Sequence, residues 1–243
     1  MKIHYSEIIS SFIDRYGLSR GEVMAEIEKS FSDILSRWHG RETIVLFSDD
    51  QLTAFGYIKT DGKVTQVPVD LTTMRGWNSV KRILDTNLGR AAILKETATC
   101  KRKERQMRWG EIVRKQSNGG FHVEIEIEEG VPITSYCPNN YVGVHERGSL
   151  MAGQKRAFHI RRVEPVYLRQ TPRLKVTVDR VSKTLVERLL QSKASGNVQI
   201  RCRNRYVGQK SFVESSAFLP REVILAASRE LGEHIQVRVI KAT

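Results

Sequence analysis

Arginine and lysine side chains recur at strand spacing in the second half of the chain. Arg201, Arg203 and Arg205 occupy alternate positions of a predicted strand and its turn, and a regular strand presents such positions on one face. Further cations follow a second predicted strand at residues 155–163, namely Lys155, Arg156, Arg161 and Arg162. Guanidinium and ammonium groups arranged in rows bind phosphate oxygens, so we predict that these residues contact the backbone of RNA.

Two pairs of ring-bearing residues lie in two of the predicted strands. Phe121 and His122 begin one strand, and Phe158 and His159 lie in another. Aromatic rings stack on the bases of single-stranded nucleic acid, and we therefore predict that these four side chains form a stacking platform. Because successive strand residues point to opposite faces, one member of each pair must face inward, and about half of the set should be structural.

One string resembles a nucleotide-binding loop but departs from it at the decisive position. Residues 148–155 read G-S-L-M-A-G-Q-K, with Gln154 where the phosphate-binding motif has Lys, and a strand rather than a helix is predicted next. The six histidines form no H-x-H or H-E-x-x-H pair, and no G-x-S-x-G motif occurs. We therefore expect a protein that is not an enzyme and that has no metal site and no cofactor.

The positive charge is confined to one part of the chain. The 243 residues carry 40 Lys and Arg against 27 Asp and Glu, a formal net charge of +13. Residues 1–100 hold 13 basic and 13 acidic side chains, whereas residues 101–243 hold 27 basic and 14 acidic ones. A neutral first part suits a protein surface, and a basic second part suits a polyanion.

Composition and cysteine usage favour a cytoplasmic location. No stretch approaches the roughly 18 apolar residues of a membrane span, and no apolar core of a signal peptide precedes the first acidic residue. Cys100, Cys137 and Cys202 are odd in number and form no C-x-x-C motif. We expect reduced thiols in the cytoplasm and no contact with a membrane.

Hydrophobic periodicity predicts an α+β multidomain chain that begins with an α/β head. Helices are predicted at residues 8–16 and 19–40, and short strands at 43–69. A connecting helix then runs from residue 80 into a basic end at residues 101–108, and the first domain is placed at residues 1–106. Trp38 and Trp109 are expected to lie in the core.

The rest of the chain predicts two smaller domains. Residues 107–180 read as short antiparallel strands, with loops at Pro132 and Pro138, and predict a five-stranded barrel of the OB type. Residues 181–243 read in the order helix, strand, strand, helix, strand, with Pro220 opening the second helix.

This succession resembles the N-terminal part of the bacterial transcription elongation factor family NusA. The most similar stretches are W-G-E-I-V at residues 109–113, M-A-G-Q-K-R-A at 151–157 and K-V-T-V-D-R-V-S at 175–182, followed by Leu185, Val186 and Leu189. They correspond to the opening strand of the family's OB domain, a later strand entry, and the passage into its first KH domain. The chain has no G-x-x-G, the motif with which KH domains grip RNA, so the third domain is expected to be a degenerate KH-like module.

The resemblance implies a function as well as a fold. It implies a shortened, divergent, non-catalytic factor whose residues 1–100 bind bacterial RNA polymerase, while the barrel and the KH-like module bind nascent single-stranded RNA. Such a factor modulates pausing, termination or antitermination, and other elongation factors are candidate partners. Two alternatives stay open: a DNA-binding regulator of a mobile element, and an RNA-binding factor of translation or RNA decay.

Overall fold

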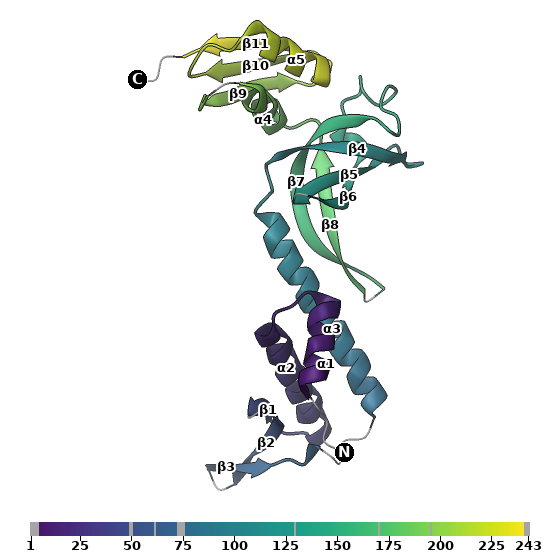
Figure 1. Ribbon diagram of the computed structural model, residues 1–243, viewed down its shortest axis with the longest axis vertical. Helices are drawn as coiled ribbons and strands as arrows, with labels where there is room; N and C mark the ends of the chain where they lie inside the picture. The colour runs from purple at the N-terminus through teal and green to yellow at the C-terminus, as the bar shows by residue number, and fades with distance from the viewer. Residues whose placement is uncertain are drawn as a thin grey trace. The chain divides into compact units, whose positions relative to one another are not determined.

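The computed structural model describes residues 5–48, 51–60, 62–71, 76–128, 130–169, 171–194 and 196–240. In these residues the chain is a mixed α+β protein whose strands form three sheets (Figure 1). It divides into two compact units: unit 1 is Met1–Glu96 with Val166–Arg173, and unit 2 is Thr97–Pro165 with Leu174–Thr243. The three-domain division expected from the sequence stays a prediction.

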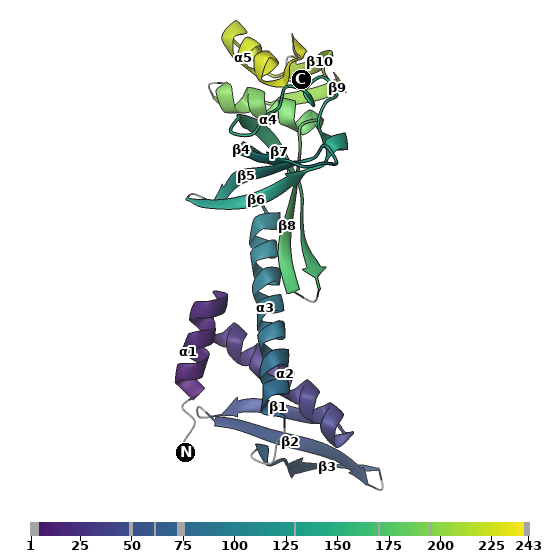
Figure 2. The ribbon, with the colours of Figure 1, turned by 90° about the vertical axis from the view of Figure 1, so that its right-hand side faces the viewer.

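Unit 1 packs helices against a small sheet. The antiparallel sheet has the order β1-β2-β3, and α2 lies along it (Figure 2). The elements are α1 (Tyr5–Tyr16), α2 (Arg20–His39), β1 (Thr43–Ser48), β2 (Gln51–Thr60), β3 (Lys63–Pro68) and α3 (Trp77–Lys101), which continues into unit 2. Buried residues from the helices and the sheet, among them Ile9, Val23, Phe31, Val45 and Leu88, form one core.

The ends of α2 are those that the sequence predicts. The Ser19 hydroxyl accepts a hydrogen bond from the Glu22 backbone N–H, and the Glu22 carboxylate accepts one from the Ser19 N–H. Gly40 ends the helix in the left-handed region at φ 63°, a conformation that other residues adopt at a cost. Local side-chain chemistry therefore determines both ends of this helix.

The connecting helix α3 ends earlier than the sequence predicts. It stops at Lys101, Arg105 adopts a left-handed φ of 64°, and β4 begins at Met107. The basic run at residues 101–108 is therefore not a helix end. It is a short connection that leads from the helix into a strand.

The first part of unit 2 is a closed ring of five strands, which we call the ring; residues 166–173, at the end of β7 and the start of β8, are assigned to unit 1. Its strands are β4 (Met107–Lys115), β5 (Phe121–Glu128), β6 (Val131–Cys137), β7 (Lys155–Leu168) and β8 (Thr171–Asp179). The order is β4-β5-β6-β8-β7. Strand β6 is parallel to β8, whereas β4 is antiparallel to β5 and β7, and β5 is antiparallel to β6. The sequence prediction missed β6, because Pro132 and Pro138 read as loop residues; Pro132 in fact lies opposite Glu126, beside a register shift that a proline tolerates.

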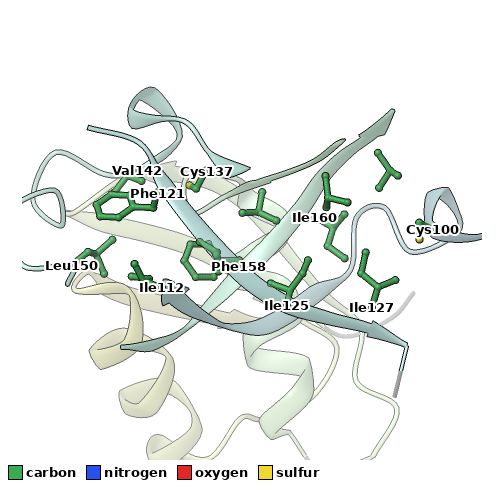
Figure 3. Close-up of a cluster of buried hydrophobic side chains, with 14 residues drawn as sticks. Cys100, Ile112, Phe121, Ile125, Ile127, Cys137, Val142, Leu150, Phe158 and Ile160 are labelled. Carbon is green, nitrogen blue, oxygen red and sulfur yellow. The ribbon is translucent and has the colours of Figure 1, made fainter. Parts of the chain in front are cut away.

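Apolar side chains from all five strands fill the inside of the ring. Phe121 and Phe158 point into this interior together with Ile112, Ile125 and Ile160 (Figure 3). Gly110 on β4 is needed there, because a Cβ on it would come within 2.7 Å of side-chain carbons of Ile125 and Val123. The alternation of apolar and acidic residues along β5 thus has its apolar side in the core, as the sequence predicts.

The last part of unit 2 is a three-stranded sheet covered on one side by two helices, which we call the C-terminal module. Its elements are α4 (Lys183–Lys193), β9 (Ile200–Tyr206), β10 (Lys210–Ser215), α5 (Arg221–Leu231) and β11 (His234–Val239). The order is β11-β10-β9, with β10 and β11 parallel. Leu185, Leu189, Ala227 and Leu231 of the helices pack with Cys202 and Val213 of the strands.

A buried ion network joins the ring to the C-terminal module. Arg180, which is 0% exposed, donates hydrogen bonds to the carboxylates of Glu146 and Glu230 and to the carbonyls of Ala157 and Glu230. Burial alone lowers the pKa of Arg180, but the hydrogen bond and charge of Glu146 and the charge of Glu230 raise it above its usual value. The guanidinium is therefore charged and fully paired in the interior.

The prediction that Trp38 and Trp109 lie in the core is wrong. Their side chains are 48% and 39% exposed, because each lies on the outer side of its element.

Of the helices that the structure describes, none combines the length and the apolar character needed to cross a bilayer.

Candidate nucleic-acid interface

Basic and aromatic side chains meet on the outer surface of β6, β8 and β7. We call this surface the ring face and define it by Tyr136, Tyr141, Arg161, Arg162, Lys175 and Thr177, which line a cleft of about 430 Å³. Tyr136 on β6 lies opposite Thr177 on β8, and Tyr141 follows β6 in the 3₁₀ helix η2 (Asn139–Tyr141). Three strands that are adjacent in the ring therefore bring these residues together.

On the ring face, one cation and two aromatic side chains lie beside aromatic rings. The Arg161 guanidinium lies over the Tyr141 ring, 4.3 Å from the ring centroid, and its Nη1 is 3.5 Å from Asp179 Oδ2. His122 lies beside Tyr136 with ring centroids 5.6 Å apart. Flat, partly exposed groups next to cations match the two parts of a nucleotide, its base and its phosphate.

The charge of the ring face is positive but partly compensated. Glu164 pairs with both Arg162 and Lys175, at 2.9 Å and 3.5 Å. The side chains of Arg162 and Lys175 nevertheless stay 70% and 46% exposed, so each can exchange a carboxylate contact for a phosphate contact. Exposed ion pairs of this kind contribute only about 0–1 kcal/mol, so the exchange is not costly.

The opposite side of the ring is acidic. Glu111 on β4 lies opposite Glu124 on β5, and together with Glu126 and Trp109 they line a cleft of about 460 Å³. Lys155, one of the predicted RNA contacts, lines this cleft and lies opposite Glu111. Arg108 also lines the cleft, so its carboxylates outnumber its cations, and it attracts phosphate less than the ring face does.

The prediction of a stacking platform is wrong for three of its four residues. Phe121 and Phe158 are 0% exposed and belong to the ring core, so no base can reach their faces. His159 points away from that core but is also buried, and its Nδ1 is 2.9 Å from Asp179 Oδ2. Only His122, which is half-buried beside Tyr136, remains at the surface.

Asp179 explains why His159 is structural. The carboxylate is fully buried and accepts hydrogen bonds from the backbone N–H groups of Val181 and Ser182 as well as from His159. Burial alone raises the pKa of Asp179, but the hydrogen bond and charge of His159 and the N–H of Ser182 lower it below its usual value. The His159 side chain therefore anchors the end of β8 instead of contacting a ligand.

The predicted arginines also divide between surface and interior. Arg201 and Arg203 are exposed, and Arg203 pairs with Glu214. The prediction that Arg205 contacts RNA is wrong. Its side chain is 2% exposed and donates hydrogen bonds to the buried Glu233 carboxylate and to the Ser182 carbonyl. Arg156 is half-buried and pairs with Glu230 at 3.4 Å, next to the Arg180 network.

Tyr136, Tyr141 and Lys175 are surface residues that the sequence prediction did not single out. Tyr136 lies in the missed strand β6, where Ser135 and Cys137 point inward and Tyr136 is half-buried at the outer surface. The β-branched and aromatic residues of this segment were the available signal. Pro132, which lies inside the strand, and Pro138, which follows it directly, concealed the strand.

Comparison with known proteins adds no relative to this description. No protein-family model matches the chain, and no curated protein matches it either.

Proposed function

We propose that the protein is a non-catalytic, NusA-like transcription factor that binds nascent RNA through unit 2 and RNA polymerase through residues 1–100, and that it modulates pausing, termination or antitermination. The observation that carries the RNA-binding part is the ring face, where the Arg161 guanidinium lies over the Tyr141 ring beside Tyr136 and Lys175. A cation next to aromatic rings provides phosphate contact and stacking surfaces to a flexible single strand.

The topology of unit 2 supports this proposal. Counted from β4, the ring has the order first, second, third, fifth, fourth, with the third strand parallel to the fifth. This is the order of OB-type barrels, which commonly bind oligonucleotides on their outer surface. The helix, strand, strand, helix, strand order of the C-terminal module, with one parallel strand pair, supports its interpretation as a KH-like module.

The surface of unit 1 supports a protein partner for this part of the chain. Residues 1–100 carry equal numbers of acidic and basic side chains, so they have no net attraction for a polyanion. Unit 1 also has an apolar cleft of about 550 Å³, lined by residues that include Ile8, Phe12, Leu52 and Trp77. An apolar cleft favours apolar groups over phosphates, and exposed apolar surface commonly marks a site for a protein partner.

Lys175→Gln is expected to weaken RNA binding, because it removes a cation from the ring face. We expect affinity for single-stranded RNA to fall roughly tenfold at most, and the slope of log affinity against log salt to become shallower by about 0.7. Fluorescence anisotropy of a labelled RNA oligomer across a salt series measures both. Lys155→Gln is the matched control: the same charge is removed from the ring, but from its acidic side, and both quantities should stay unchanged. Equal losses in the two variants would contradict the assignment of the ring face.

The transcription part is tested with purified bacterial RNA polymerase. On a template with a pause and a terminator, single-round transcription in the presence of the protein should change the pause dwell time or the read-through. The full chain should co-purify with polymerase, and a charge substitution in the apolar cleft of unit 1, Phe12→Glu, should remove both effects while RNA binding persists. An unchanged transcription profile together with absent co-purification would contradict the polymerase assignment but not RNA binding.

A further inference from the structure

The sheet of the C-terminal module has one side that the described helices do not cover. Ile200, Cys202, Val213 and Ile235 point toward α4 and α5 and are buried there. Their neighbours along each strand point the other way. We call this second surface the open sheet face. The strand register brings Arg201, Tyr206, Lys210, Phe212, Glu214 and Arg238 together on it, and Arg203, the unpaired residue at the register shift, lies beside them.

Two exposed aromatic rings lie next to each other on the open sheet face. Tyr206 at the end of β9 is 57% exposed and Phe212 in the middle of β10 is 36% exposed. Their centroids are 6.3 Å apart with the rings nearly perpendicular, and Lys210 Nζ lies 4.9 Å from the Phe212 centroid. A phenylalanine on the solvent side of a central strand leaves apolar surface in water, and a stacked base would cover it.

Three arginines and one glutamate lie at the other end of the open sheet face. In the register, Glu214 lies between Arg201 on β9 and Arg238 on β11, and it pairs with Arg203. Arg201 and Arg238 are exposed, and neither forms an ion pair with another residue that the structure describes. The open sheet face therefore has positive charge at one end and aromatic rings at the other, within a single sheet.

This arrangement is that of sheet surfaces that stack single-stranded bases, as in RRM domains, where aromatic residues on the central strands contact the bases. The usual KH grip is absent, because the chain has no G-x-x-G and residues 216–220 read S-A-F-L-P before α5. A module that has lost the loop on its helical side but carries rings and cations on its sheet has a different surface for the same ligand.

We propose that the open sheet face is a second binding site for single-stranded RNA, in which Tyr206 and Phe212 stack on bases and Arg201 and Arg238 contact phosphates. The inference rests on the proposed function in taking RNA as the ligand. The inference goes beyond the proposed function because it assigns RNA to a different surface, which is neither the ring face nor the helical side of the C-terminal module.

The test uses the full chain and a fluorescein-labelled uridine dodecamer. The double variant Tyr206→Ala/Phe212→Ala should lower RNA affinity at least about tenfold, since each stacked base contributes several-fold or more. Tyr206→Phe should retain affinity, because a ring that stacks needs no hydroxyl. The matched control is Phe218→Ala, which removes an equally large ring that is 78% exposed in the segment before α5, and affinity should stay unchanged. Circular dichroism and urea unfolding establish that each variant is folded.

Crosslinking with RNA that contains 4-thiouridine distinguishes the possible failures. Crosslinks at Tyr206 or Phe212 support the proposal. Wild-type binding with crosslinks only at Tyr136 or Tyr141, and no loss in the double variant, overturns the second site but leaves the proposed function intact. A loss in Phe218→Ala alone would move the site to the helical side and overturn the proposal. No binding of RNA by the wild type would overturn the second site and the proposed function together. If duplex DNA bound the protein in preference to RNA, the ligand would be DNA, and the proposal of an RNA site would be overturned.

Discussion

Arg180→Ala is expected to lower the free energy of unfolding of unit 2 by about 3–5 kcal/mol. The substitution leaves the carboxylates of Glu146 and Glu230 buried without their shared cation, and breaking a buried ion pair from one side costs this much. Because a domain is typically stable by only about 5–15 kcal/mol, the loss approaches unfolding. The carbonyls of Ala157 and Glu230 lose their hydrogen-bond donors at the same time.

Urea unfolding followed through Trp109 measures this loss. Trp38→Phe and Trp77→Phe remove the other tryptophans, both of which lie in unit 1, so that the signal reports unit 2. Arg188→Ala is the matched control, because Arg188 is exposed on α4, and a change within about 0.5 kcal/mol is expected. Arg180→Met combined with Glu146→Gln and Glu230→Gln should recover part of the loss, since no buried charge then stays unpaired. A loss below about 1 kcal/mol in Arg180→Ala would show that the network does not hold the module to the ring.

Arg205→Glu is expected to unfold the C-terminal module, although the sequence groups Arg205 with two exposed arginines. The new carboxylate would face Glu233, which also accepts hydrogen bonds from Ser211 and the Gly208 N–H. Repulsion between two buried carboxylates adds to the lost pair, so we expect a loss of at least about 3 kcal/mol. RNA binding should fall as a consequence of unfolding.

Arg201→Glu is the control that separates folding from binding. Arg201 is exposed and lies opposite Glu214, so its reversal should change stability by less than about 1 kcal/mol. RNA affinity should nevertheless fall, and the fall should persist in protein that circular dichroism shows to be folded. Wild-type stability in Arg205→Glu would contradict the buried role of Arg205. Reversing the charge of all three arginines at once would lower stability and RNA affinity together, so neither effect could be assigned to a residue.

The arginine row illustrates what strand spacing can and cannot predict. Strict alternation predicts that residues 201, 203 and 205 share a face. The register of β9 with β10 shifts, so that Cys202 lies opposite Val213 and Asn204 lies opposite Phe212. Arg203 is therefore an extra residue, and a bulge of this kind reverses the alternation beyond it. This is why Arg205 points to the helices while Arg201 points to solvent.

Strand alternation also does not predict how exposed to solvent a side chain is. The alternation of β5 and β7 correctly separates Phe121 from His122 and Phe158 from His159. It does not predict that the outer side of β7 is itself covered, as it is at Ala157, which belongs to the core of the C-terminal module. His159 is buried on this side with Asp179, so a residue on the outer side of a strand is not necessarily a surface residue.

The sequence by itself determined the elements whose signals are local. The capping box and Gly40 delimit α2, the alternation of Val123, Ile125 and Ile127 makes β5, and the charge counts separate a neutral part from a basic one. Only the tertiary structure decided that β6 is a strand, that Arg180 is buried between two carboxylates, and that Tyr136, Tyr141 and Arg161 meet. The physical reason is that helix caps and alternation depend on residues a few positions apart, whereas burial and shared surfaces depend on strand pairing between segments far apart in the chain.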